Sequence, residues 1–139
     1  MDDIHSYIRT RCGLHPRIDG KNAGRFTDMN LLMGTAYMLL AVVHMFKIYG
    51  GYDLFLGMVL LVEAGIYFFG SSENPAEEKR KYAHTYVGGI MALWLSIYVV
   101  LKWLINLSSA ELRLPDLLLI PLGILAFVIA RVARRRILS

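Results

Sequence analysis

The chain has 139 residues, of which 56% are hydrophobic, and it carries a formal net charge of +4. Its mean hydropathy of +0.48 is too high for an ordinary soluble domain of this length. A single cysteine, Cys12, excludes an intramolecular disulfide and a cysteine-based metal cluster.

The first 28 residues are polar and are expected to form a cytoplasmic segment. Within them, Ile4, Tyr7 and Ile8 recur at helical spacing, which favours a short amphipathic helix in the headgroup region. The residues that follow include Pro16 and several glycines, which predict a turn-rich linker. Because this polar stretch precedes the first apolar segment and no small-residue cleavage site is evident, we do not expect a signal peptide.

Four apolar segments follow, each close to the roughly 20 residues that cross a hydrocarbon core of about 30 Å. They lie at about residues 30–49, 53–70, 86–105 and 115–131. The first connecting loop is very short, so the first two helices should be antiparallel neighbours. We therefore expect an all-α integral membrane protein, with a compact four-helix domain over residues 29–133 and a basic cytoplasmic tail over residues 134–139.

The basic residues are unevenly distributed between the two sides of these spans. Twelve of the 15 lysines and arginines fall in the amino-terminal segment, in the second loop or in the stretch from Arg131 to the last residue. This positive-inside pattern predicts that both termini are cytoplasmic, and it favours anionic lipid headgroups as partners over nucleic acid. A prokaryotic cytoplasmic membrane is the simplest location for so small a chain.

Small residues recur at helical spacing along the spans. In lipid, where no hydrophobic force drives helices together, close backbone packing is a main source of helix association. The sequence therefore predicts a compact bundle with little room for a large solute. The small residues expected at helix contacts are Gly34, Ala41, Gly57, Gly89, Ala92, Gly123 and Ala126.

A weak internal repeat appears when the first span is laid on the third with an offset of 55 residues. Gly34 then meets Gly89, while Asp53 and Asp116 precede similar runs at the start of the second and fourth spans. Apolar helices also resemble one another by chance, so duplication of a hairpin and chance similarity both stay open. A true duplication would relate the halves by an axis along the membrane normal.

One carboxylate, Glu63, lies deep in an otherwise apolar part of the second span. A rise of about 1.5 Å per residue places it about 15 Å from the outer boundary, near the bilayer midplane. A charge there costs at least about 2.5 kcal/mol, so the side chain should face the bundle, be paired or be protonated. Such a residue is a candidate functional site.

Three interpretations of Glu63 stay open. Protonated Glu63 could hydrogen-bond Ser96 or Tyr67, which lie at similar depth, and so fix the helix register. It could instead form a proton relay through a water to His44. Because it projects away from the small face of its own helix, it could also contact another subunit. The candidate protonatable or binding residues are Glu63, His44, Tyr67 and Ser96.

Cofactor chemistry has little support in the sequence. Haem ligation by two histidines requires them at one depth on facing helices, whereas His44 and His84 lie at different depths. Glu63 and His44 alone are too few for a metal site. No phosphate-binding loop, nucleophile elbow or zinc-protease motif is present. We therefore expect no cofactor and no metal, and we favour a non-enzymatic role.

Basic and aromatic side chains near the span ends are expected to anchor the protein at the membrane interfaces. Long basic side chains extend to the headgroups, and tryptophan suits the interface between lipid and water. The predicted anchors are Lys47, Lys102, Trp103, Arg134, Arg135 and Arg136.

Two functional hypotheses from different classes follow. In the favoured one, the chain is a non-catalytic structural or accessory subunit that packs with itself, as an oligomer, or with a larger membrane complex. In the alternative, it is a proton-coupled transporter or ion-conducting oligomer, and Glu63 is the site that binds and releases the proton.

Overall fold

The computed structural model describes residues 20–46, 48, 53–73, 78–105 and 114–138, and every regular element within them is an α-helix. The helices are α2 (Gly20–Met45), α3 (Leu54–Ser72), α4 (Glu78–Ile105) and α5 (Leu114–Leu138). All four are long and apolar enough to cross a membrane, which confirms the predicted all-α architecture. The predicted amphipathic helix in the first dozen residues, and Lys47, lie outside the described residues.

Three helices extend beyond the apolar segments that predict them. α2 begins at Gly20, inside the expected turn-rich linker, and α4 begins at Glu78. α5 continues through the arginines of the expected tail to Leu138. Hydropathy marks where a helix leaves the hydrocarbon, whereas Lys, Glu and Arg are good helix formers and let the backbone hydrogen bonds continue into the polar region.

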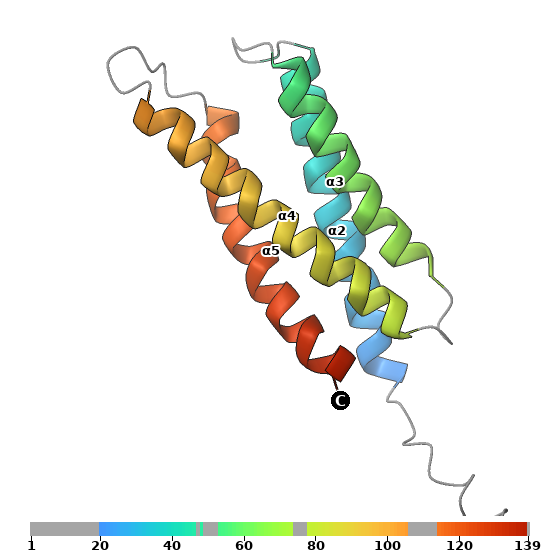
Figure 1. Ribbon diagram of the computed structural model, residues 1–139. Helices are drawn as coiled ribbons and strands as arrows, with labels where there is room; N and C mark the ends of the chain where they lie inside the picture. Colours follow the sequence, from blue (N-terminus) through green and yellow to red (C-terminus); the bar gives the residue numbers. More distant parts are fainter. Residues whose placement is uncertain (1–19, 47, 49–52, 74–77, 106–113, 139) are drawn as a thin grey trace, which may run out of the picture.

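The helices form two antiparallel hairpins, α2 with α3 and α4 with α5, arranged as an elongated bundle (Figure 1). Contacts within each hairpin are more extensive than contacts between them, and α3 against α4 is the main contact between the hairpins. The buried faces of all four helices point into this bundle. The large apolar side chains that are exposed lie on the outer faces, as expected for a surface in contact with lipid.

In the first hairpin, two glycines allow the helices to approach closely. A methyl group added at Gly34 of α2 would lie 3.3 Å from the carbonyl oxygen of Ala64 on α3. A methyl group at Gly57 of α3 would lie 3.3 Å from the carbonyl oxygen of Ala41 and would clash with the Met45 side chain. Each glycine therefore faces the backbone of the partner helix.

The second hairpin is packed still more closely. A methyl group at Gly89 of α4 would lie 2.6 Å from the carbonyl oxygen of Ala126 on α5, and one at Gly123 of α5 would lie 2.6 Å from that of Ala92. These distances leave no room for a side chain unless the backbones separate. The seven small residues that the sequence places at helix contacts are all buried.

We predict that Gly123→Ala destabilises the protein by about 1–3 kcal/mol, because the added methyl group must push α4 and α5 apart. The matched control is Gly65→Ala on α3, where a methyl group meets no atom within 4 Å. This control should be neutral or stabilising by up to about 1 kcal/mol, since alanine has the higher helix propensity. Unfolding in detergent micelles measures both, and equal stabilities would contradict the close approach.

Candidate functional site

Glu63 lies at the centre of the buried face of α3. Leu60, Glu63, Ala64 and Tyr67 follow the spacing that puts residues on one side of a helix, and all four are buried. The Glu63 side chain is 0% exposed. This position is incompatible with the interpretation in which Glu63 contacts another subunit, because the remaining helices of its own chain cover it.

Two tyrosines from different helices accompany Glu63. Tyr37 on α2 and Tyr67 on α3 are both buried, and their rings are stacked at an interplanar angle of 5° with centroids 5.8 Å apart. Gly88 on α4 makes room for Tyr67, since a methyl group there would lie 2.8 Å from the phenol ring. The site therefore involves three helices and lies where the two hairpins meet.

The polar atoms of this site have no hydrogen-bond partner among the described residues. They are the two carboxyl oxygens of Glu63 and the hydroxyls of Tyr37 and Tyr67. Glu63 is nevertheless close enough to both phenols to interact with them electrostatically. A carboxyl group with two phenols beside it can hold a proton, and it can donate to or accept from a small polar species. We call Tyr37, Glu63 and Tyr67 the midplane site.

Ser96 does not belong to the midplane site, contrary to the sequence-based interpretation. Its hydroxyl donates to the carbonyl oxygens of Ala92, at 3.0 Å, and Leu119, at 2.9 Å. Because one of these carbonyls belongs to α4 and the other to α5, Ser96 joins the helices of the second hairpin. Hydropathy and depth alone could not show which neighbour a serine hydroxyl would contact.

His44 is directed away from Glu63 as well. Its Nε2 atom lies 3.5 Å from Oδ1 of Asp116 on α5, a distance that fits an ion pair when the histidine is protonated. His44 is 3% exposed. The carboxyl oxygens of Glu63 have no hydrogen-bond partner among the described residues, so the relay through a water to His44 stays a prediction.

A second cross-link lies at the same end of the bundle. Nζ of Lys102 on α4 donates to Oδ2 of Asp53 at 3.1 Å, and Oδ1 of Asp53 accepts the Leu56 N–H at 2.9 Å, which caps α3. Together with the pair of His44 and Asp116, this ion pair joins one hairpin to the other. We call these four side chains the outer polar layer. The sequence marked Asp53 and Asp116 as equivalent positions but did not identify their partners.

Asp53 is held in its charged form. Burial opposes ionisation, but the Leu56 N–H and the Lys102 ammonium outweigh it and hold the pKa of Asp53 below its ordinary value of 3.8. A carboxylate whose pKa is lowered in the folded state stabilises the fold above its unfolded pKa. That stabilisation is lost as the pH falls through the folded pKa.

At the opposite end of the bundle, polar contacts join α2 to α4. The Thr85 hydroxyl donates to Oδ1 of Asn30 at 2.8 Å, and Nζ of Lys81 donates to Oγ1 of Thr27 at 3.1 Å. We call these residues the inner polar layer. Asn30 and Thr85 fall on each other under the 55-residue offset, but their mutual contact depends on how the hairpins meet.

The predicted anchors that the structure describes lie near helix ends. Trp103 and Arg134, Arg135 and Arg136 are exposed, whereas Lys102 is half-buried and bonded to Asp53. Among the described residues, no group of three or more His, Cys, Asp or Glu side chains could hold a metal ion. No family model, curated protein or solved structure matches this chain.

We predict that Asp53→Asn lowers stability by about 1 kcal/mol at pH 7, because asparagine can still cap α3 but loses the ion pair with Lys102. The difference from the wild type should begin to shrink as the pH falls below about 3.8, and it should vanish below the lowered pKa of folded Asp53, where that carboxylate becomes neutral. Unfolding in detergent at several pH values measures it. Asp28→Asn, at an exposed position on α2, is the control. A difference independent of pH would contradict the role of the Asp53 charge.

Proposed function

We propose that the chain spans the membrane four times with both termini in the cytoplasm. The antiparallel helix order puts the start of α2, the start of α4 and the end of α5 at one end of the bundle (Figure 1). Exposed basic residues gather at this end, namely Arg25, Lys79, Arg80, Arg134, Arg135 and Arg136. Their position supports the inward orientation of both termini and contact with anionic lipid headgroups.

We also propose that the two hairpins arose by duplication. The six buried positions between Asn30 and His44 of α2 all fall on buried positions of α4 when the 55-residue offset is applied. The equivalent residues Asn30 and Thr85 hydrogen-bond each other, as expected for residues beside an axis that relates two halves. Both observations are independent of the sequence similarity that suggested the repeat.

For the function, we propose that the protein binds and releases a proton at Glu63 as part of a transport cycle. The observation that supports this most directly is a fully buried carboxyl without a hydrogen-bond partner among the described residues. Ionisable side chains at this depth are costly and usually serve ion or proton pathways. Glu63 also lies between two similar hairpins, where transporters built from repeats place their sites.

The polar layers on both sides of the midplane site suit such a cycle. The ion pair of Asp53 with Lys102, the approach of His44 to Asp116 and hydrogen bonds join the hairpins at the two ends, whereas the closest backbone packing lies within each hairpin. Opening one polar layer and keeping the other closed would expose Glu63 to one side of the membrane. The small-residue contacts would preserve each hairpin as a rigid unit during this movement.

The second candidate function is the non-catalytic accessory subunit that the sequence analysis favoured. It is supported by the complete enclosure of Glu63, which suits a permanently neutral acid that fixes helix register. Large aromatic side chains on the outer faces, Phe55, Phe69 and Trp94, are at least 67% exposed and offer a surface to other membrane helices. The small-residue stripes no longer support contacts with a partner, because they are used within the chain.

We predict that the wild type, reconstituted into liposomes containing a pH-sensitive dye, dissipates a proton gradient. Glu63→Gln should lower this flux by about tenfold or more, because it removes the carboxyl group at the middle of α3 and leaves an amide that cannot bind and release a proton. The matched control is Glu78→Gln in the first turn of α4, which should transport like the wild type.

Equal flux through the wild type and Glu63→Gln, at equal protein content, would contradict the transport proposal. In that case, co-purification of both proteins from native membranes tests the accessory role. A folded Glu63→Gln variant that loses its membrane partners would support the subunit function instead.

A further inference from the structure

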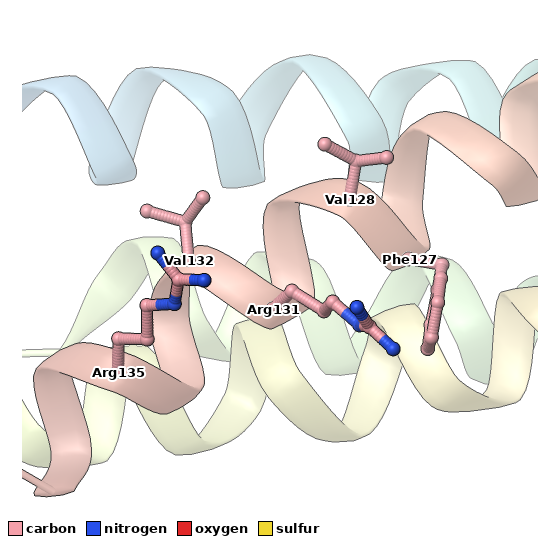
Figure 2. A pocket seen from close by; sticks show the side chains of 5 residues that line it. All are labelled: Phe127, Val128, Arg131, Val132 and Arg135. Carbon is pink, nitrogen blue, oxygen red and sulfur yellow. The ribbon is translucent and has the colours of Figure 1, made fainter.

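The outer surface of α5 carries an open groove of about 380 Å³ near the basic end of the bundle. Figure 2 shows the five side chains that line it, all from this one helix. They form two rows along the helix, and neighbours within a row are one helical turn apart. One row holds Phe127, Arg131 and Arg135, and the other holds Val128 and Val132. The groove thus combines two positive charges with an apolar wall, and none of its residues belongs to the midplane site.

The two arginines are available to a ligand. The guanidinium of Arg131 lies 5.3 Å from the centroid of the Phe127 ring, which holds it along the helix, and the Arg135 side chain extends toward Val132 (Figure 2). No carboxylate of the described residues forms an ion pair with Arg131 or Arg135. Two unneutralised guanidinium groups one turn apart are suited to binding a phosphate, which accepts several hydrogen bonds at once.

The depth of the groove indicates where that phosphate lies. Arg131 and Arg135 are 17 and 21 residues after the start of α5 at Leu114. At about 1.5 Å per residue, they lie about 26 Å and about 32 Å along the helix. A hydrocarbon core of about 30 Å that begins level with Leu114 ends between the backbone positions of these two residues, at the level of lipid headgroups.

The apolar row continues from the groove toward the bilayer midplane. Val132, Val128 and Ile124 succeed one another every four residues, and all three are exposed on the outer face of α5. A free phosphate ion would use the arginines alone, whereas a phospholipid would also lay an acyl chain along this row. The ligand that matches both features is an anionic phospholipid.

We propose that α5 carries a specific site for an anionic phospholipid, with its phosphate between Arg131 and Arg135 and an acyl chain along Ile124, Val128 and Val132. The site needs the orientation proposed above, which places this end of α5 in the anionic leaflet, but it does not depend on Glu63. The experiments on proton flux and on lipid binding therefore test different residues, and a negative result in one does not decide the other.

The test is lipid titration of the full chain in detergent, with bound lipids counted by native mass spectrometry. Phosphatidylglycerol should bind at least about tenfold more tightly than phosphatidylcholine, since only the former carries a net charge. The Arg131→Gln, Arg135→Gln double variant should lose this preference. The control double variant, Arg134→Gln with Arg136→Gln, removes the same charge outside the groove and should keep it.

A third variant, Val128→Trp, leaves every charge in place, and its larger side chain occupies the space along the apolar row where the acyl chain would lie. It should also weaken binding of phosphatidylglycerol, and it covers the case in which the arginine variant does not fold. Equal losses in the two arginine variants would overturn the proposal, because they would indicate general attraction to the basic helix end. Inorganic phosphate that displaces the lipid at equal concentration, or unchanged binding to Val128→Trp, would overturn it as well.

Discussion

Direct contact between helix backbones is the constraint on which this structure depends. Gly89 and Gly123 each face a carbonyl oxygen of the partner helix, as Gly34 and Gly57 do in the first hairpin. Lipid chains are as apolar as the side chains they contact, so burying leucine gives little association energy in a bilayer. Dispersion between closely packed backbones supplies that energy instead, and it requires residues without bulky side chains.

The contacts between the hairpins have a different chemical character. Where the small residues hold α2 to α3 and α4 to α5, polar side chains join one hairpin to the other at both ends of the bundle. Between these polar layers lie Tyr37, Glu63 and Tyr67, and Gly88 makes room for the Tyr67 ring. Close packing is thus concentrated within the hairpins, and groups that can change partner or protonation state are concentrated between them.

The outer surface of the bundle also has two chemically different parts. The middle of the bundle presents apolar and aromatic side chains to the lipid, whereas the ends of α4 and α5 carry Trp103 and the arginines. The groove on α5 lies where these two kinds of surface meet, so its residues combine features of both. The two proposals therefore concern separate parts of the molecule, with proton binding proposed for the interior and lipid binding proposed for the outer surface of α5.

Four long apolar helices, their approximate positions and the small residues at their contacts were predictable from the sequence. These features follow from hydropathy and helical spacing, which are local properties of the chain. The sequence also identified Glu63 as an ionisable side chain near the middle of the second apolar segment. It did not extend α2 to Gly20 or α5 to Leu138, because charged residues end a hydrophobic segment without ending a helix.

The contacts between side chains of different helices could not be predicted in the same way. Depth placed Ser96 at the level of Glu63 and connected His44 to Glu63 only through a water, but rotation of each helix about its axis directs Ser96 to Leu119 and His44 to Asp116. Tyr37, which depth counting did not select, stacks on Tyr67 instead. A sequence gives the position of a residue along its helix axis, whereas contact also depends on how four helices are rotated and packed against one another. That arrangement is set by the glycine and alanine contacts acting together.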